Sequence, residues 1–143
     1  MSANHDNIDK FKIVSGIVIQ SLMEKFPQQE FVEYEDICGV YCEKFYPEAV
    51  KNNTTEFVID EEFVESTIEW LVKEGYLRRE AGMFTLTEKT LAALNVIPLG
   101  KNETIGATLS GAAKKAAGET ARSAISSVVG ELIGAAAKGF IGA

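Results

Sequence analysis

The segment DEEFVESTIEWLVKEGYLRRE, residues 60–80, constrains the fold most because it marks both ends of one helix. Asp60 is a residue type that caps helix N-termini, and Gly75 stands where a left-handed residue ends a helix. Positions between them recur at helical spacing and define an inward face: Val64, Thr67, Ile68 and Leu71. The outward face carries Glu62, Glu65, Glu69 and Lys73. We therefore expect an amphipathic helix with an acidic exposed face.

A hairpin and a short helix are predicted directly after this helix. YLRRE and MFTLT have the pattern of two strands joined around Ala81 and Gly82, a pair suited to a tight turn. Thr87 then caps a short helix, EKTLAALN, which ends near Asn95.

Three further segments are predicted upstream. Apolar residues recur at helical spacing over residues 7–26 and indicate a largely buried helix, which Pro27 ends. EFVEY, residues 30–34, alternates apolar and acidic side chains and predicts a short edge strand. EDICGVYCEKF, residues 35–45, predicts a second helix that Pro47 stops, and a long polar connection follows.

The order helix, strand, helix, helix, hairpin, helix resembles the winged helix-turn-helix superfamily. The run EFVESTIEWLVKEGYLRREAGMFTLTEKTLAAL is similar to that superfamily's third helix, wing and following helix, and the resemblance covers residues 8–96. Small bacterial and prophage-associated members, including YjcQ-like ones, also resemble this chain in a helical, apolar C-terminus. The resemblance implies a mainly α fold with a small β-hairpin wing (α+β) and implies no established activity.

The composition changes abruptly after this domain. Residues 101–143 contain 11 alanines and 7 glycines. We therefore expect a winged-helix domain at 1–97, a linker at 98–104 and an amphipathic Ala/Gly-rich helical tail at 105–143. Within the tail, Thr104 caps a first helical segment, 105–117, and Gly118 offers a break.

The second tail segment has an apolar face and a face of small residues. The apolar face is formed by Ile125, Val128, Val129, Leu132, Ile133 and Phe140. The small residues, which let helix backbones approach closely, are Ser126, Gly130, Gly134, Ala135 and Gly139. Because glycines weaken an isolated helix, the tail needs a partner surface.

Three partner surfaces suit the tail. It can fold back over its own domain, associate with a second copy, or lie in the plane of a membrane as a peripheral contact through residues 104–143. A membrane-spanning role is disfavoured because Glu131 and Lys138 would lie within the bilayer. The polar N-terminus lacks a secretory signal, so we expect a cytoplasmic protein, with the inner face of the membrane as the alternative.

The charge of the chain favours a protein partner over DNA. The formal net charge is −7, with 18 acidic and 9 basic residues in residues 1–100, which opposes phosphate binding. We interpret Glu62, Glu65, Glu69 and Lys73 as a face for a protein partner. The alternative is a DNA-binding regulator dimerised through its tail, whose candidate nucleic-acid contacts are Lys73, Arg78, Arg79 and Lys89. Alternatively, the two arginines have no ligand and form ion pairs with neighbouring Glu74 or Glu80.

We expect no catalytic residues, no cofactor and no metal site. The sequence has no nucleophile motif, phosphate loop or paired histidines. Cys38 and Cys42 lie four apart in a helical pattern, which suits reduced, partly buried thiols, and the lone His5 is far away in the sequence. The chain is therefore expected to be a non-enzymatic interaction protein. A membrane-perturbing effector acting through the tail is a further alternative.

Overall fold

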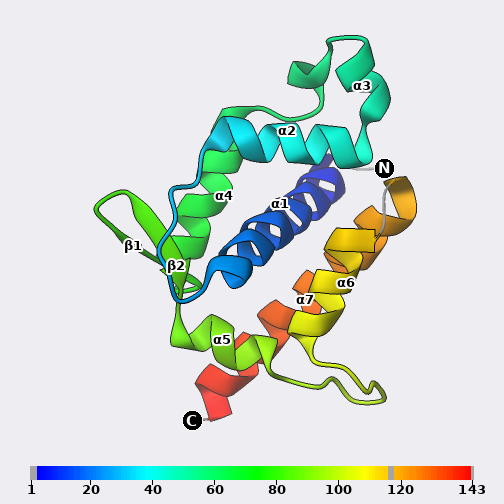
Figure 1. Ribbon diagram of the computed structural model, residues 1–143. Coiled ribbons are helices and arrows are strands. Elements are labelled where there is room, and N and C mark those ends of the chain that lie inside the picture. The colour runs from blue at the N-terminus through cyan, green and yellow to red at the C-terminus, as the bar shows by residue number, and fades with distance from the viewer. Residues whose placement is uncertain (1–2, 116–117, 143) are drawn as a thin grey trace.

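The computed structural model of the chain describes residues 3–115 and 118–142, with side chains placed for residues 7–114 and 118–138 (Figure 1). It is mainly helical, with one antiparallel two-stranded sheet. The elements are α1 (Ala3–Lys25), α2 (Tyr34–Phe45), α3 (Pro47–Lys51), the 3-10 helix η1 (Thr55–Phe57), α4 (Glu61–Lys73), β1 (Leu77–Glu80), β2 (Met83–Leu86), α5 (Glu88–Leu94), α6 (Ile105–Lys115) and α7 (Gly118–Gly142).

The capping and turn signals of residues 60–95 are confirmed. The N–H of Phe63 donates to Oδ1 of Asp60 at 2.8 Å at the start of α4, and Gly75 has a φ of 85° after its end. Ala81 and Gly82, at φ 52° and 79°, form the turn between β1 and β2. These two left-handed residues match the twist of the strands, which explains the tight hairpin.

The predicted strand at 30–34 is wrong beyond its first residue. Glu30 alone pairs with Phe84 of β2, through hydrogen bonds of 2.9 and 2.8 Å that run in both directions. Phe31 is 65% exposed, and Tyr34 already begins α2. The alternation of apolar and acidic residues therefore does not correspond to a buried face, because the chain turns into a helix after one bridge.

Pro47 does more than stop α2. It occupies the first turn of α3, where its missing N–H is not needed, and η1 follows before α4. The predicted polar connection between α2 and α4 thus contains two short helices.

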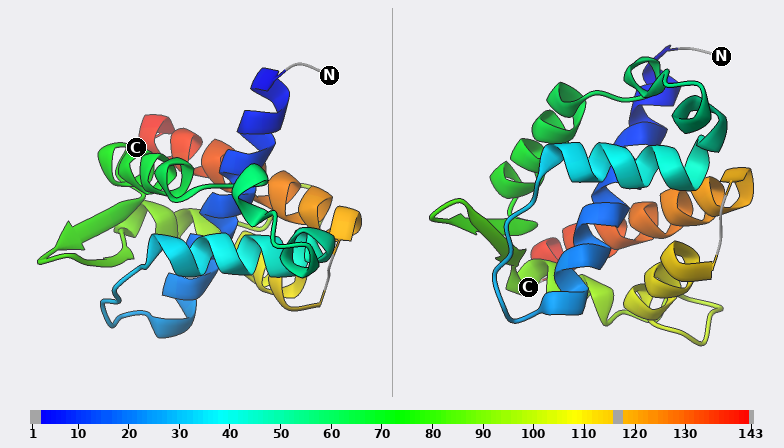
Figure 2. Two further views of the ribbon diagram at one scale, coloured as in Figure 1. Left: turned by 90° about the horizontal axis from the view of Figure 1, so that it is seen from above. Right: turned by 45° about the horizontal axis from the view of Figure 1, so that its top comes forward.

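Helix α1 lies at the centre of the molecule and is covered from several sides (Figures 1 and 2). It contacts α2 and α4, and it also contacts α6 and α7. Helix α7 packs in addition against α5 and α6. The tail therefore contributes to the same hydrophobic cluster as the rest of the chain. The boundaries at 97 and 104 stay a prediction, and residues on both sides of them share this core.

Helices α1 and α7 approach each other closely at Gly16. A Cβ atom placed on Gly16 would lie 2.6 Å from Cγ2 of Ile125 and 3.1 Å from Cγ2 of Val129. Both partners are β-branched methyl groups close to their backbone, so they have little freedom to move aside. The absence of a side chain at Gly16 is what lets the two helices pack.

We expect Gly16→Ala to lower the free energy of unfolding. Overpacking costs about 1–3 kcal/mol, which outweighs the gain of roughly 1 kcal/mol from replacing a helical glycine. Gly39→Ala in α2 is the matched control, because a Cβ there meets nothing within 4 Å. It should raise stability by about 0.5–1 kcal/mol. Urea denaturation measures both, and an equal gain in both variants would contradict the close contact.

Candidate functional site: the acidic surface of α2 and α4

The predicted partner-binding residues form one exposed stripe on α4. Glu62, Glu65, Glu69 and Lys73 are all exposed, while Val64, Thr67, Ile68 and Leu71 on the opposite side of the helix are buried. The amphipathic pattern of the sequence is thus confirmed. That this stripe binds a partner stays a prediction.

Arg79 of β1 belongs to this surface and is engaged within the chain. Its Nη2 forms an ion pair with Oε1 of Glu69, and its guanidinium lies 5.2 Å from the ring centroid of Phe84. The alternative prediction, an ion pair between Arg79 and Glu74 or Glu80, was wrong. The hairpin folds back beside α4, which brings Arg79 to a carboxylate ten residues earlier, whereas Gln29 donates to Glu80 at 3.0 Å.

The other candidate nucleic-acid contacts come from three elements, α4, β1 and α5. Lys89 donates to the backbone oxygen of Glu74 at 2.8 Å, and its amine lies 4.4 Å from the ring centroid of Tyr76. Arg78 is exposed on the hairpin, and Lys73 is exposed on α4. Two of the four predicted basic contacts, Arg79 and Lys89, are therefore held by interactions within the chain.

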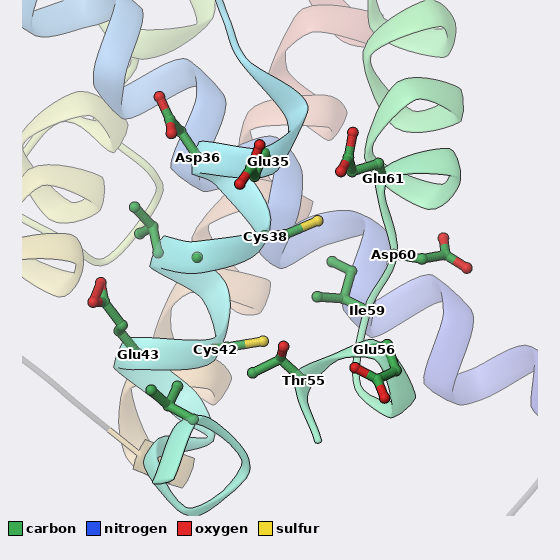
Figure 3. A pocket seen from close by; sticks show the side chains of 13 residues that line it. Glu35, Asp36, Cys38, Cys42, Glu43, Thr55, Glu56, Ile59, Asp60 and Glu61 are labelled. Atoms are coloured by element: carbon green, nitrogen blue, oxygen red, sulfur yellow. The ribbon is translucent and has the colours of Figure 1, made fainter. Parts of the chain in front are cut away.

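An acidic groove that the sequence did not reveal adjoins the start of α4. It has a volume of about 840 Å³ and lies between α2 and the segment that leads into α4 (Figure 3). Its lining includes six carboxylates and no lysine or arginine: Glu35, Asp36, Glu43, Glu56, Asp60 and Glu61. No local pattern could have revealed it, because its two walls lie about 20 residues apart in the sequence.

The inner wall of this acidic groove carries the two thiols. Cys38 and Cys42 point from α2 toward the 55–61 segment (Figure 3). Burial, together with the neighbouring Cys42 and the carboxylates of Glu61 and Asp60, raises the pKa of Cys38 to about 11. Burial also raises the pKa of Cys42. Both thiols are therefore protonated at neutral pH and are weak nucleophiles.

Metal binding was not expected from the sequence. Within residues 3–115 and 118–142, no three His, Cys, Asp or Glu side chains are placed to hold an ion together.

The apolar face of the tail lies inside the core of its own chain. Ile125, Val128, Val129 and Leu132 are buried, and Ile133 is partly buried against the core. The side chain of Phe140 lies outside the described residues. Self-association or membrane attachment through this face stays a prediction, and it would require α7 to separate from α1 and α5. Among the described residues, no helix combines the length and the apolar character needed to cross a bilayer.

The two described glycines of the tail's small-residue face, Gly130 and Gly134, make no tight helix contact within the chain. A Cβ on Gly130 would lie 3.7 Å from Nζ of Lys12, and one on Gly134 would meet nothing within 4 Å. Ser126 donates to Asp9 at 3.3 Å, and Ala135 is partly buried against the core. The surroundings of Gly139 lie outside the described residues. Gly16 of α1 makes the close approach instead.

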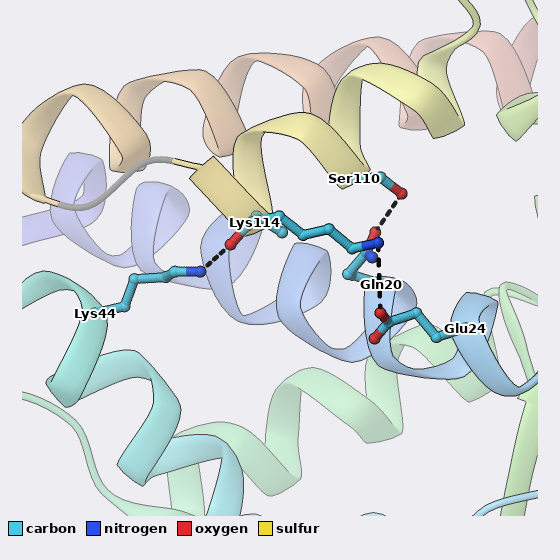
Figure 4. Close-up of polar contacts among 6 residues, drawn as sticks. Gln20, Glu24, Lys44, Ser110 and Lys114 are labelled. Atoms are coloured by element: carbon cyan, nitrogen blue, oxygen red, sulfur yellow. Dashed lines mark hydrogen bonds and ion pairs between the residues drawn. The ribbon is translucent and has the colours of Figure 1, made fainter.

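Polar contacts fix α6 against α1 and α2 (Figure 4). Ser110 donates to Gln20 at 3.0 Å, and Lys114 lies 3.8 Å from Glu24. Lys44 of α2 donates to the backbone oxygen of Ala113. These contacts join the first tail helix to two helices of the N-terminal half.

Comparisons with protein-family models, with curated proteins and with solved structures found no match to this chain.

We expect Cys38 to be alkylated slowly in the folded chain. A pKa of about 11 instead of 9.0 lowers the thiolate fraction at pH 7.5 by roughly 100-fold relative to the unfolded chain. The rate should rise tenfold per pH unit and level off only near pH 11. Because the folded state keeps a proton that the unfolded state loses between pH 9 and 11, stability should fall over that range.

Iodoacetamide labelling followed by peptide fragmentation separates Cys38 from Cys42. The same chain in denaturant is the control, in which both thiols react with ordinary pKa values. A plateau of the Cys38 rate below pH 9 in the folded chain would contradict burial of this thiol.

Proposed function

We propose that this chain is a non-enzymatic interaction module that binds a basic region of a protein partner through the acidic surface of α4 and α2. The observation that carries the proposal is the continuity of the negative charge. Glu61 lines the acidic groove and lies one turn before Glu65, which belongs to the exposed stripe of α4. A partner that covers the stripe therefore also reaches the groove.

Coulomb's law and solvation favour a cationic partner here. Nine acidic side chains, the six that line the groove and those of Glu62, Glu65 and Glu69, give this surface a high density of negative charge. Of these nine, only Glu69 takes part in one of the ion pairs found among the described residues. Lysine or arginine side chains of a partner are attracted by this charge, which accelerates association.

The proposal extends to the fold, which we infer to be a winged helix-turn-helix arrangement. The order of α1, α2, α4 and the hairpin supports it, as does the single bridge of Glu30 to Phe84, which stands where a winged helix has its first strand. In such an arrangement α4 is the recognition helix. Its acidic stripe would repel phosphates, so DNA binding is less well supported than a protein partner.

In this proposal the tail completes the core of the module. The buried side chains of α6 and α7 cover α1, and self-association through them would uncover it. The exposed acidic surface, in contrast, is available without any rearrangement.

Selection from a random peptide display library against the full chain tests the proposed function. We expect enrichment of lysine- and arginine-containing peptides whose binding weakens with added salt. The triple variant Glu62→Gln, Glu65→Gln, Glu69→Gln should bind the selected peptides at least about tenfold more weakly, which corresponds to roughly 1.4 kcal/mol.

A second triple variant, Glu88→Gln, Glu103→Gln, Glu119→Gln, is the matched control. It removes the same charge at three exposed positions outside this surface. Equal losses of peptide affinity in the two triple variants would show that binding depends on the net charge of the chain alone. Selection of peptides without basic residues would refute the proposed function.

A further inference from the structure

A second groove, apolar in character, flanks α4 on the side away from the acidic groove. It has a volume of about 440 Å³ and lies between the N-terminal part of α1 and α4. Its lining is formed by Asn7, Ile8, Phe11, Lys12, Phe63, Ser66, Thr67 and Trp70. We call it the α1–α4 groove. None of its residues belongs to the lining of the acidic groove.

The aromatic wall of the α1–α4 groove is fixed before any ligand arrives. Trp70 stacks on Tyr76 with ring centroids 5.7 Å apart, and Phe11 meets Trp70 edge-on at 5.0 Å. Trp70 nevertheless remains 38% exposed and Ile8 52% exposed. A rigid, partly exposed aromatic wall beside an exposed aliphatic side chain is a typical anchor pocket for apolar side chains.

One rim of this groove is acidic. Glu62 and Glu69 immediately precede Phe63 and Trp70, and Ser66 belongs both to the outward side of α4 and to the groove. The α4 wall from Phe63 to Trp70 covers two helical turns, about 10 Å. That length matches apolar residues of a ligand helix at positions i, i+3 or i+4, and i+7.

The opposite wall carries two lysines, and only one of them turns away from the groove. The amine of Lys12 lies 3.7 Å from where a Cβ of Gly130 would be, so it is directed toward α7. The amine of Lys10 lies 5.1 Å from the ring centroid of Phe63, a residue of the groove lining. A basic ligand therefore meets the two glutamates of α4 on one side and a single lysine amine, already engaged with an aromatic ring, on the other.

We infer that the α1–α4 groove binds an amphipathic helix of a protein partner, with apolar anchors in the groove and basic residues against Glu62 and Glu69. This inference rests on the proposed function and names the class of partner. A helix fits because both walls are helices and offer no open strand edge to which an extended ligand could add, whereas a helix satisfies its own backbone hydrogen bonds and presents apolar anchors on one face.

Two other occupants fit the charges less well. A second copy of the chain would bring its own stripe of three glutamates and one lysine close to this one, and like charges would oppose one another. An anionic lipid surface would be repelled by the same rim. The acidic rim therefore favours a basic helix.

Fluorescence tests the inference directly, because Trp70 is the single tryptophan of the chain and lines the groove. The probe is a tryptophan-free 18-residue peptide with leucines at helical spacing flanked on one side by lysines. A scrambled peptide of the same composition is its control. We expect the helical peptide to shift Trp70 emission to shorter wavelength with saturation, and the scrambled peptide to bind at least tenfold more weakly.

The Ile8→Gln variant should bind the helical peptide at least tenfold more weakly, because the substitution makes an exposed wall of the groove polar without adding charge. Leu99→Gln is the matched control, since Leu99 is fully exposed in the loop before α6 and lies outside the groove. It should bind as the unmodified chain does. Circular dichroism of both variants checks that the helices are retained.

Each contrary result identifies what has failed. Suppose that the triple variant of Glu62, Glu65 and Glu69 binds the peptide more weakly, but Ile8→Gln leaves the affinity unchanged and the peptide does not shift Trp70 emission. The acidic surface is then supported as the binding site, and the groove inference is overturned. Equal binding of the helical and scrambled peptides also overturns it. A concentration-dependent shift of Trp70 emission without peptide would assign the groove to a second copy, and a shift with anionic vesicles alone would assign it to lipid.

Discussion

The packing of α7 against α1 is the contact on which the rest of the structure depends. Helix α1 has buried residues around most of its circumference, and α2 and α4 cover only part of it. Helices α6 and α7 contact the remainder, and their buried side chains include Ile105, Leu109, Ile125, Val128, Val129 and Leu132. Burial of one such side chain contributes about 1.5–3 kcal/mol, so the six together rival the whole stability of a typical domain. Any role that requires the tail to leave must supply free energy of that order.

Helix α4 gains its importance from what lies on its two flanks. On one side is a groove whose lining includes six acidic residues, and on the other is a groove whose lining includes the aromatic rings of Phe11, Phe63 and Trp70. The acidic stripe runs between them, so charge and apolar area are presented together along one helix. This arrangement combines fast electrostatic encounter with apolar anchoring, two features that a binding surface needs for different reasons.

The parts of the fold that could be predicted from the sequence are those set by neighbours along the chain. Asp60 and Gly75 bound α4 because caps act within one turn, and Ala81 and Gly82 specify the hairpin by backbone conformation alone. The prediction of a strand at 30–34 was wrong because alternating apolar and acidic residues do not reveal whether a neighbouring strand is available for pairing beyond Glu30. The apolar face of α7 was identified correctly, but periodicity does not reveal which surface covers it. Both grooves were missed because they join distant segments, as Ile8 and Trp70 do.

The small sheet has a further consequence for the behaviour of the chain in solution. A hairpin edge with free N–H and C=O groups invites other chains to add strands and aggregate. Here the bridge from Glu30 occupies a position on the outer edge of β2, and three consecutive charged side chains, Arg78, Arg79 and Glu80, are exposed on β1. Among the described residues, the edge of this sheet is therefore short, partly occupied and charged, which disfavours the addition of a strand from another chain.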